Sequence, residues 1–141
     1  MPTFDDATTT AATPLAVWQI LYDPLRFPEW WSGFGEVRRG DASGGSADIT
    51  MWPDGYPDFP MPQLMETRSR DHRVVVSCTI SDILFDWRLE VAPPGTRIAV
   101  HVEIPEKEAA RLATQQDVVS ASLRRLAELA EGATDGLPAP G

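Results

Sequence analysis

The stretch that decides the fold class is Ile83-Leu84-Phe85-Asp86-Trp87-Arg88-Leu89-Glu90-Val91, in which apolar and polar side chains alternate from Phe85 onwards. A period of two is typical of a β-strand that buries one face. The segment 97–104, RIAVHVEI, shows the same alternation after a turn at 93–95. Together the two segments predict an antiparallel hairpin with one dry face, which a second layer must cover.

Further strands are predicted around this hairpin, separated by turns rich in Gly, Pro, Ser and Asp. They cover residues 3–10, 34–39, 47–52, 63–70 and 74–80. After the first of them, Thr13-Pro14 opens a helix as N-cap and first helical residue. Asp23-Pro24 ends this helix, and a second short helix is expected over 24–31.

The longest helix is predicted over 106–131, where apolar side chains recur every three or four residues. Gly132 is expected to end it, and residues 132–141, rich in Gly, Pro and Ala, to form a disordered tail. This order predicts one α+β domain over 1–131. A curved antiparallel sheet of about seven strands would wrap round the last helix, which leaves room for a cavity between the two layers.

Composition narrows the range of partners. The 141 residues include 21 acidic and 12 basic side chains, for a net charge of −9, and Lys107 is the one lysine. A nucleic-acid partner is therefore not expected, since phosphate binding needs clustered cations. No apolar run is long enough for membrane insertion. The lone Cys78 and the lack of a secretory signal predict a cytoplasmic location, and two His and one Cys at unrelated spacings predict neither a metal site nor a cofactor.

Four segments of the chain resemble the START-like (SRPBCC) superfamily, which has the helix-grip fold and includes Bet v 1-like proteins and polyketide cyclases/dehydrases. They are ATPLAVW at 12–18, DPLRFPEWW at 23–31, WRLEV at 87–91 and PGTRI at 94–98. The resemblance covers residues 3–131 in order. It implies a ligand cavity between the sheet and the last helix. It implies no single function, because this fold carries lipid transfer, hormone sensing, ring cyclisation and co-chaperone work.

The resemblance also implies which side chains line that cavity. From the short helix and the second strand come Phe27, Trp31 and Phe34, and from the fourth strand Leu64, Glu66 and Arg68. The floor is assigned to Phe85, Trp87, Val100 and Val102, with Val119 and Ser122 on the helix above. Trp52 joins these aromatic residues as a side chain that could stack a planar ligand, and ordinary core packing is the alternative.

Arg68 is the candidate catalytic residue. In aromatic-polyketide aromatase/cyclases an inward Arg near this position is associated with ring closure, and a guanidinium can stabilise an enolate or a carboxylate. Where those enzymes can offer a phenol and an amide, this sequence has Phe34 and Ser122.

The orientation of the fourth strand is left open by the sequence. A shift of one residue turns Met65 and Thr67 inward and leaves Glu66 and Arg68 in solvent. The loop 53–62, with four prolines, is extended and carries Tyr56 and Phe59. We interpret it as a lid over the cavity or, equally, as a dimer contact, so the chain is expected to be a monomer or a homodimer.

Three functions follow from these observations. The first is binding of a hydrophobic or aromatic small molecule. The second is an enzyme of the polyketide cyclase/dehydratase type. The third is a co-chaperone-like interaction module that uses an outer face rather than the cavity.

Overall fold

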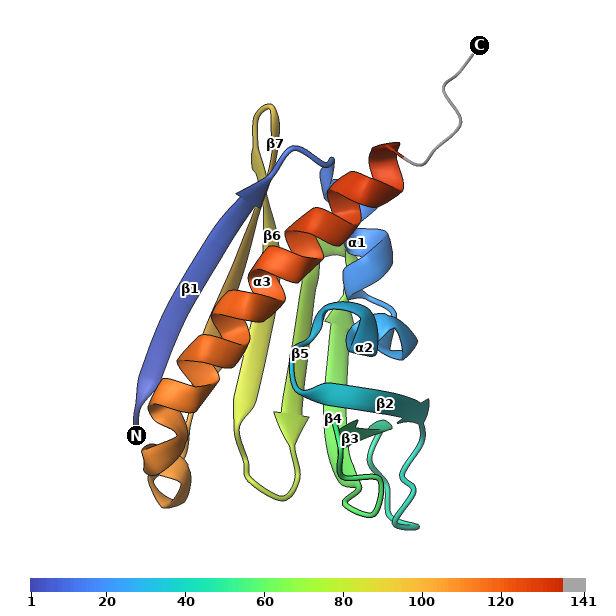
Figure 1. Ribbon diagram of the computed structural model, residues 1–141, viewed down its shortest axis with the longest axis vertical. Coiled ribbons are helices and arrows are strands. Elements are labelled where there is room, and N and C mark those ends of the chain that lie inside the picture. The colour runs from blue at the N-terminus through green and yellow to red at the C-terminus, as the bar shows by residue number, and fades with distance from the viewer. Residues whose placement is uncertain (136–141) are drawn as a thin grey trace.

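Seven antiparallel strands form one curved sheet in the computed structural model, which describes residues 1–135 (Figure 1). Their order across the sheet is β1-β7-β6-β5-β4-β3-β2. The strands are β1 (Thr3–Thr10), β2 (Phe34–Arg39), β3 (Ile49–Pro53), β4 (Met61–Arg68), β5 (Arg73–Cys78), β6 (Leu84–Ala92) and β7 (Gly95–Glu103). The predicted α+β class and all seven strands are confirmed, with ends that differ by at most two residues.

The hairpin of β6 and β7 forms the centre of one half of the sheet. β6 pairs with β7 from Leu84 to Ala92, and β1 adds to the other side of β7. At the turn, Gly95 lies so close to the end of β1 that a Cβ atom there would overlap the carbonyl oxygen of Thr10. A side chain at this position would therefore push β1 off the sheet.

Two short helical segments follow β1 and cover one end of the sheet. The helix α1 (Pro14–Leu21) begins where predicted: the Thr13 hydroxyl accepts a hydrogen bond from Ala16 N at 3.2 Å, and Pro14 is the first helical residue. The predicted second helix is divided into a 3₁₀ turn, η1 (Pro24–Arg26), and α2 (Phe27–Trp30). Asp23 caps the turn through Leu25 N at 3.0 Å.

The long helix α3 (Leu112–Asp135) crosses the concave face of the sheet diagonally (Figure 1). The predicted start at 106 is a 3₁₀ segment, η3 (Glu106–Arg111). The predicted end at Gly132 is wrong, because a glycine inside a helix costs only about 1 kcal/mol and strong helix formers precede it. Residues 132–135 of the predicted tail are thus helical, and residues 136–141 lie outside the described residues. No helix within residues 1–135 is both long and apolar enough to cross a bilayer.

A cluster of aromatic side chains fills the space between α2, the sheet and the C-terminal half of α3. Trp30, Trp31 and Trp87 are almost fully buried, and Phe27 packs against the first two. Trp30 meets Trp87 edge to face at 5.0 Å between ring centroids. Such edge-to-face pairs add about 0.5–1.5 kcal/mol each beyond their buried area. This cluster therefore fixes one end of the interlayer space as solid core.

Candidate ligand-binding cavity

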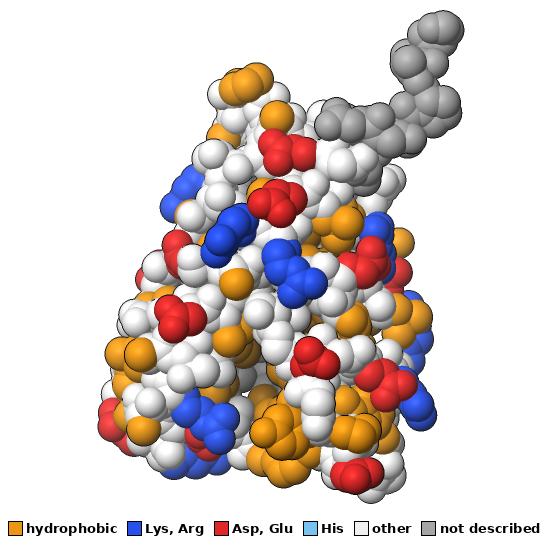
Figure 2. Space-filling view, in the orientation of Figure 1, with side chains coloured by type: hydrophobic (Ala, Val, Ile, Leu, Met, Phe, Trp, Pro, Cys, Tyr) orange, Lys and Arg blue, Asp and Glu red, His pale blue; other side chains and the backbone are white. Residues whose placement is uncertain are grey.

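A cavity of about 310 Å³ lies at the other end, between the N-terminal half of α3 and strands β3 to β6. Figure 2 shows the surface hollowed beside this part of α3, with hydrophobic side chains gathered along one side of the opening. The volume is at the lower end of the range for small-molecule sites. It equals that of about ten water molecules, at roughly 30 Å³ each in the liquid.

One wall of the cavity is aromatic. Trp31 directly follows α2, Phe34 begins β2, and Phe85 comes from β6. Trp31 meets Phe34 and Phe85 edge to face, at 5.8 and 4.9 Å between ring centroids. Gly33 has a φ of +95°, a conformation that favours glycine, and it turns the chain so that Trp31 and Phe34 both reach the cavity. This wall presents ring edges and faces to a ligand.

The opposite corner is polar and buried. Gln63, on β4, pairs directly with Cys78, on β5, and the two side chains share the inner face of the sheet. Ser81 lies in the turn after β5, and its backbone N–H donates to Cys78 Sγ at 3.5 Å. All three residues are less than 10% exposed. The cavity therefore has one aromatic wall and one corner that can form hydrogen bonds.

The rim of the cavity, where η3 passes into α3, carries the one cation among its lining residues. Arg111 extends beside the opening, and its Nε lies 2.6 Å from Glu108 Oε2. Its side chain is 61% exposed, so it lies at the mouth rather than inside. Thr114, Gln115 and Val118 continue the same helix face inward.

Three predicted lining residues, Trp31, Phe34 and Phe85, lie in the cavity wall. Ser122 lies just beyond: its hydroxyl accepts a hydrogen bond from Ser32 N at 2.9 Å and donates one to Val118 O at 2.6 Å. This bond ties α3 to the turn that carries the aromatic wall. The other predicted floor and roof residues are buried in the solid core instead, because the tryptophan cluster fills the space they face; they are Phe27, Trp87, Val100, Val102 and Val119.

The predicted inward orientation of β4 is wrong. Leu64, Glu66 and Arg68 lie on the outer face of the sheet, where all three are exposed. Glu66 and Arg68 form an ion pair there, with 2.8 Å between Oε1 and Nε. Their register partners on β5 also face out, while Gln63 and Met65 face α3. Arg68 is therefore outside the cavity and cannot act on a molecule within it.

Two further predictions concern β3 and the loop after it. Trp52 is buried, but on the outer face, where the Arg38 guanidinium lies 5.3 Å from its ring centroid. The adjacent Met51 faces the cavity in its place. Tyr56 and Phe59 are 66% and 53% exposed and do not line the cavity. Their loop leaves the cavity wall at Pro53 and returns to it at Met61, so the lid hypothesis stays a prediction.

The comparisons with known proteins find likeness in structure alone. No protein-family model and no curated protein matches the sequence. The Zhui aromatase/cyclase from Streptomyces sp. R1128 superposes with a TM-score of 0.75 at 14% identity, over 92% of this chain and 93% of that one. The chain has the helix-grip fold. At such low identity the likeness establishes the fold and not the activity.

Two more solved structures show the same relation. The di-domain ARO/CYC BexL, from the BE-7585A biosynthetic pathway, gives a TM-score of 0.72 at 13% identity. The match covers 91% of this chain but 46% of BexL, so the chain spans about half of that protein. Protein CV1439 from Chromobacterium violaceum gives 0.68 at 20% identity, over 92% of this chain and 96% of that one.

Sequence reasoning missed most of the polar lining of this cavity. Arg111, Gln115 and Val118 were detectable, since they precede Ser122 at helical spacings of eleven, seven and four residues and so share its face. Gln63 and Ser81 carried no such signal. Their place depends on strand register and on a turn, which the local sequence does not specify.

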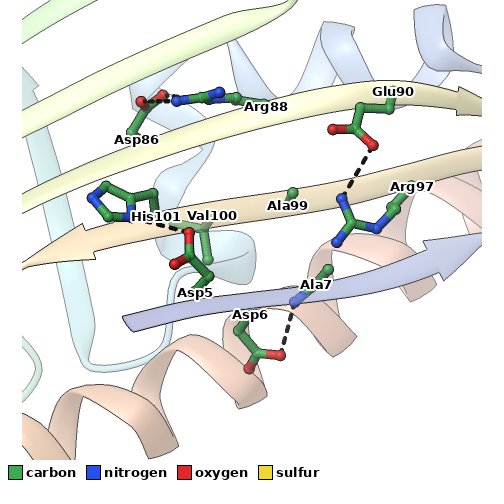
Figure 3. Close-up of a pocket in the computed structure, with 10 residues that line it drawn as sticks. All are labelled: Asp5, Asp6, Ala7, Asp86, Arg88, Glu90, Arg97, Ala99, Val100 and His101. Carbon is green, nitrogen blue, oxygen red and sulfur yellow. Dashed lines mark hydrogen bonds and ion pairs between the residues drawn. The ribbon is translucent and has the colours of Figure 1, made fainter. Parts of the chain in front are cut away.

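A second, larger hollow of about 550 Å³ lies on the outer face of the sheet, over β1, β7 and β6 (Figure 3). Apart from Asp6, which accepts a hydrogen bond from Ala7 N, its charged side chains already form ion pairs. Arg97 contacts Glu90 at 3.1 Å, and His101 contacts Asp5 at 3.0 Å. A ligand here would have to displace ion pairs on an open surface, so we regard the apolar interlayer cavity as the candidate site.

The most buried member of this charged face is Asp86, which accepts hydrogen bonds from both Arg73 and Arg88. Burial alone raises the pKa of the Asp86 carboxyl, but the two guanidinium groups outweigh burial and hold the pKa below its ordinary value. The same bonds raise the pKa of each arginine. This cluster ties β5 to β6 on the outer face and serves the fold.

Proposed function

We propose that this protein binds a small, largely apolar, planar molecule in the cavity between the sheet and α3. The observation that carries the proposal is the aromatic wall of Trp31, Phe34 and Phe85 facing a space of about 310 Å³. Aromatic walls of this kind bind ring systems through offset and edge contacts. The volume suits a molecule of one or two fused rings, since it equals about ten waters.

The lining also indicates how such a molecule is oriented. Polar side chains lie at the buried corner around Gln63, at the rim at Arg111, at Ser32, and along the start of α3 at Thr114 and Gln115, and the rest of the lining is largely apolar. A few fixed polar groups in a mostly apolar pocket give a ligand its orientation. We infer that the rings lie against the aromatic wall, between the corner and the rim.

Cys78 provides a direct test, because it is the only cysteine of the chain and lines the cavity. The protein is treated with methyl methanethiosulfonate, a small apolar thiol reagent, with and without 2-naphthol as a two-ring probe, and the modified fraction is followed by intact mass. With free probe at ten times its Kd, modification should slow about tenfold, because only the unoccupied fraction reacts.

The matched control moves the thiol out of the cavity. The double variant Cys78→Ala/Ser120→Cys places it on the exposed face of α3, where 2-naphthol should leave the rate unchanged. Equal slowing in both proteins, or none in the natural one, contradicts binding at this site.

A second candidate function is favoured by the two aromatase/cyclases among the structural neighbours. An enzyme of that type would need a cation for the enolate, and Arg111 at the rim takes the place that Arg68 cannot. Incubation with a linear poly-β-ketone and detection of the aromatic product by absorbance test this candidate. Arg111→Ala should abolish the acceleration of aromatic product formation, while Arg68→Ala should leave this acceleration intact. If the natural protein does not accelerate the reaction, the enzyme candidate is rejected. The interaction-module hypothesis stays a prediction.

A further inference from the structure

The side-chain amide of Gln63 is a buried polar group of the cavity wall. Gln63 is 3% exposed, and its Nε2 donates to the carbonyl oxygen of Met61 at 3.2 Å. This bond fixes which end of the amide faces the cavity, since the reversed amide would bring two acceptor oxygens together. Within residues 1–135 the one hydrogen bond of this side chain is the Nε2 bond, so Oε1 has no protein donor. The fully buried side-chain atoms without a partner in this range are the indole N–H groups of Trp30, Trp31 and Trp87, of which Trp31 lines the cavity. An acceptor with two lone pairs is thus held ready at the closed corner of the cavity.

The neighbours of Gln63 give Oε1 no hydrogen bond. Ser81 Oγ accepts a hydrogen bond from Ile83 N at 3.3 Å, and Cys78 Sγ accepts one from Ser81 N. The unused donors at the corner are the second Nε2 proton of Gln63, one hydroxyl proton and one thiol proton, and none of them bonds to Oε1. The group that complements Oε1 is therefore a strong donor, a hydroxyl or N–H, brought in by the ligand.

We propose that Gln63 selects ligands that carry such a donor, so that the cavity binds hydroxy-aromatic molecules in preference to their alkyl and ether analogues. This inference rests on the proposed binding function and specifies its ligand class. A ligand without a donor would expel water from Oε1 and leave a buried acceptor unpaired, which is more costly than forming the bond is favourable. We expect a preference of about 10- to 100-fold in Kd, the usual range for one such unpaired group.

Three probes of nearly equal shape isolate this effect. 2-Naphthol has a donor, 2-methoxynaphthalene an acceptor only, and 2-methylnaphthalene neither, and binding of each is measured by titration calorimetry. The natural protein should bind 2-naphthol about 10- to 100-fold more tightly than the other two. The Gln63 side-chain N–H resonances in a ¹⁵N-correlated spectrum should shift on adding 2-naphthol.

Gln63→Leu removes the acceptor at similar side-chain size and should bring the three Kd values within about threefold of one another. The variant should bind 2-naphthol more weakly, and 2-methylnaphthalene more tightly, than the natural protein does. Should this variant fail to fold, Gln63→Met serves the same purpose. Met65→Leu, on the same strand and face but outside the cavity lining, should keep the natural preference.

The outcomes separate this inference from the proposed function. Equal binding of the three probes by the natural protein overturns the selection by Gln63 and leaves the binding function standing. A preference that persists in Gln63→Leu overturns it as well. If no probe binds, both fail.

Discussion

Filling the cavity from α3 is the sharpest test of where the ligand lies. Val118 is partly buried, packs on the core and lines the cavity. The substitution Val118→Phe adds four carbon atoms, worth about 3 kcal/mol if all were buried at ~0.8 kcal/mol each. Steric strain of about 1–3 kcal/mol opposes this gain. We therefore expect the free energy of unfolding to stay within about 1 kcal/mol of that of the natural protein.

Ligand binding should respond far more strongly than stability. If the new ring covers only about 80 Å² of apolar wall, at ~25 cal/mol per Å², binding loses ~2 kcal/mol, or about 30-fold in Kd. The assay is titration of 2-naphthol by calorimetry, with urea unfolding followed by tryptophan fluorescence. Gln116→Phe, on the exposed side of the same helix, controls for the effect of Phe on α3 and should bind normally. Unchanged affinity in Val118→Phe would refute the placement of the ligand in this cavity.

Three further predictions follow from the outer face and the loop. Arg68→Ala should change the free energy of unfolding in urea by less than about 1 kcal/mol and leave the affinity for 2-naphthol unchanged, because the ion pair of Arg68 is exposed. A large loss of affinity would instead indicate that Arg68 faces the cavity. Asp86→Asn should cost about 1–2 kcal/mol at pH 7, below the usual range for a broken buried ion pair because both arginines keep access to solvent. Since the folded-state pKa of Asp86 is lowered, its carboxylate stabilises the fold fully above the unfolded pKa of about 4, and this stabilisation is lost as the pH falls below that value. The free energy of unfolding, measured in urea, should therefore decrease less between pH 5 and 2 in Asp86→Asn than in the natural protein. Replacing Tyr56 and Phe59 by Ala should weaken 2-naphthol binding at an unchanged melting temperature if their loop is a lid; a lower melting temperature with unchanged affinity rejects the lid.

The regular part of the fold was predictable because its strands alternate clearly. In β6 and β7 every second side chain is apolar, so the inner positions of Phe85, Trp87, Val100 and Val102 followed directly from the sequence. The capped start of α1 at Thr13 was equally local, since one hydroxyl and one proline specify it. These features depend on short-range chemistry, which a single sequence contains.

The register of β4 was not predictable for an equally physical reason. Its sequence places apolar Leu64 and Met65 side by side, and its partner β5 contains three consecutive valines, 74–76. Neither strand therefore distinguishes its two faces by polarity. The inner face is fixed by pairing across the sheet, where Gln63 lies against Cys78. Hydrophobic patterning alone predicts a glutamine near the start of a strand to be exposed, so it does not indicate that Gln63 is buried.

The same unexpected glutamine explains why the cavity is suited to a small ligand with two distinct ends. The tryptophan cluster around Trp30 and Trp87 closes the space under α2, so a molecule can occupy only the half that lies beneath the start of α3. Within that half, Gln63 closes one end and Arg111 flanks the opening. A ligand longer than two rings would have to pass Arg111 into solvent, where the guanidinium would meet any carboxylate or carbonyl that it carries. The two proposed functions therefore depend on different parts of one site: we propose ligand selection by Gln63, and the cyclase candidate would depend on Arg111.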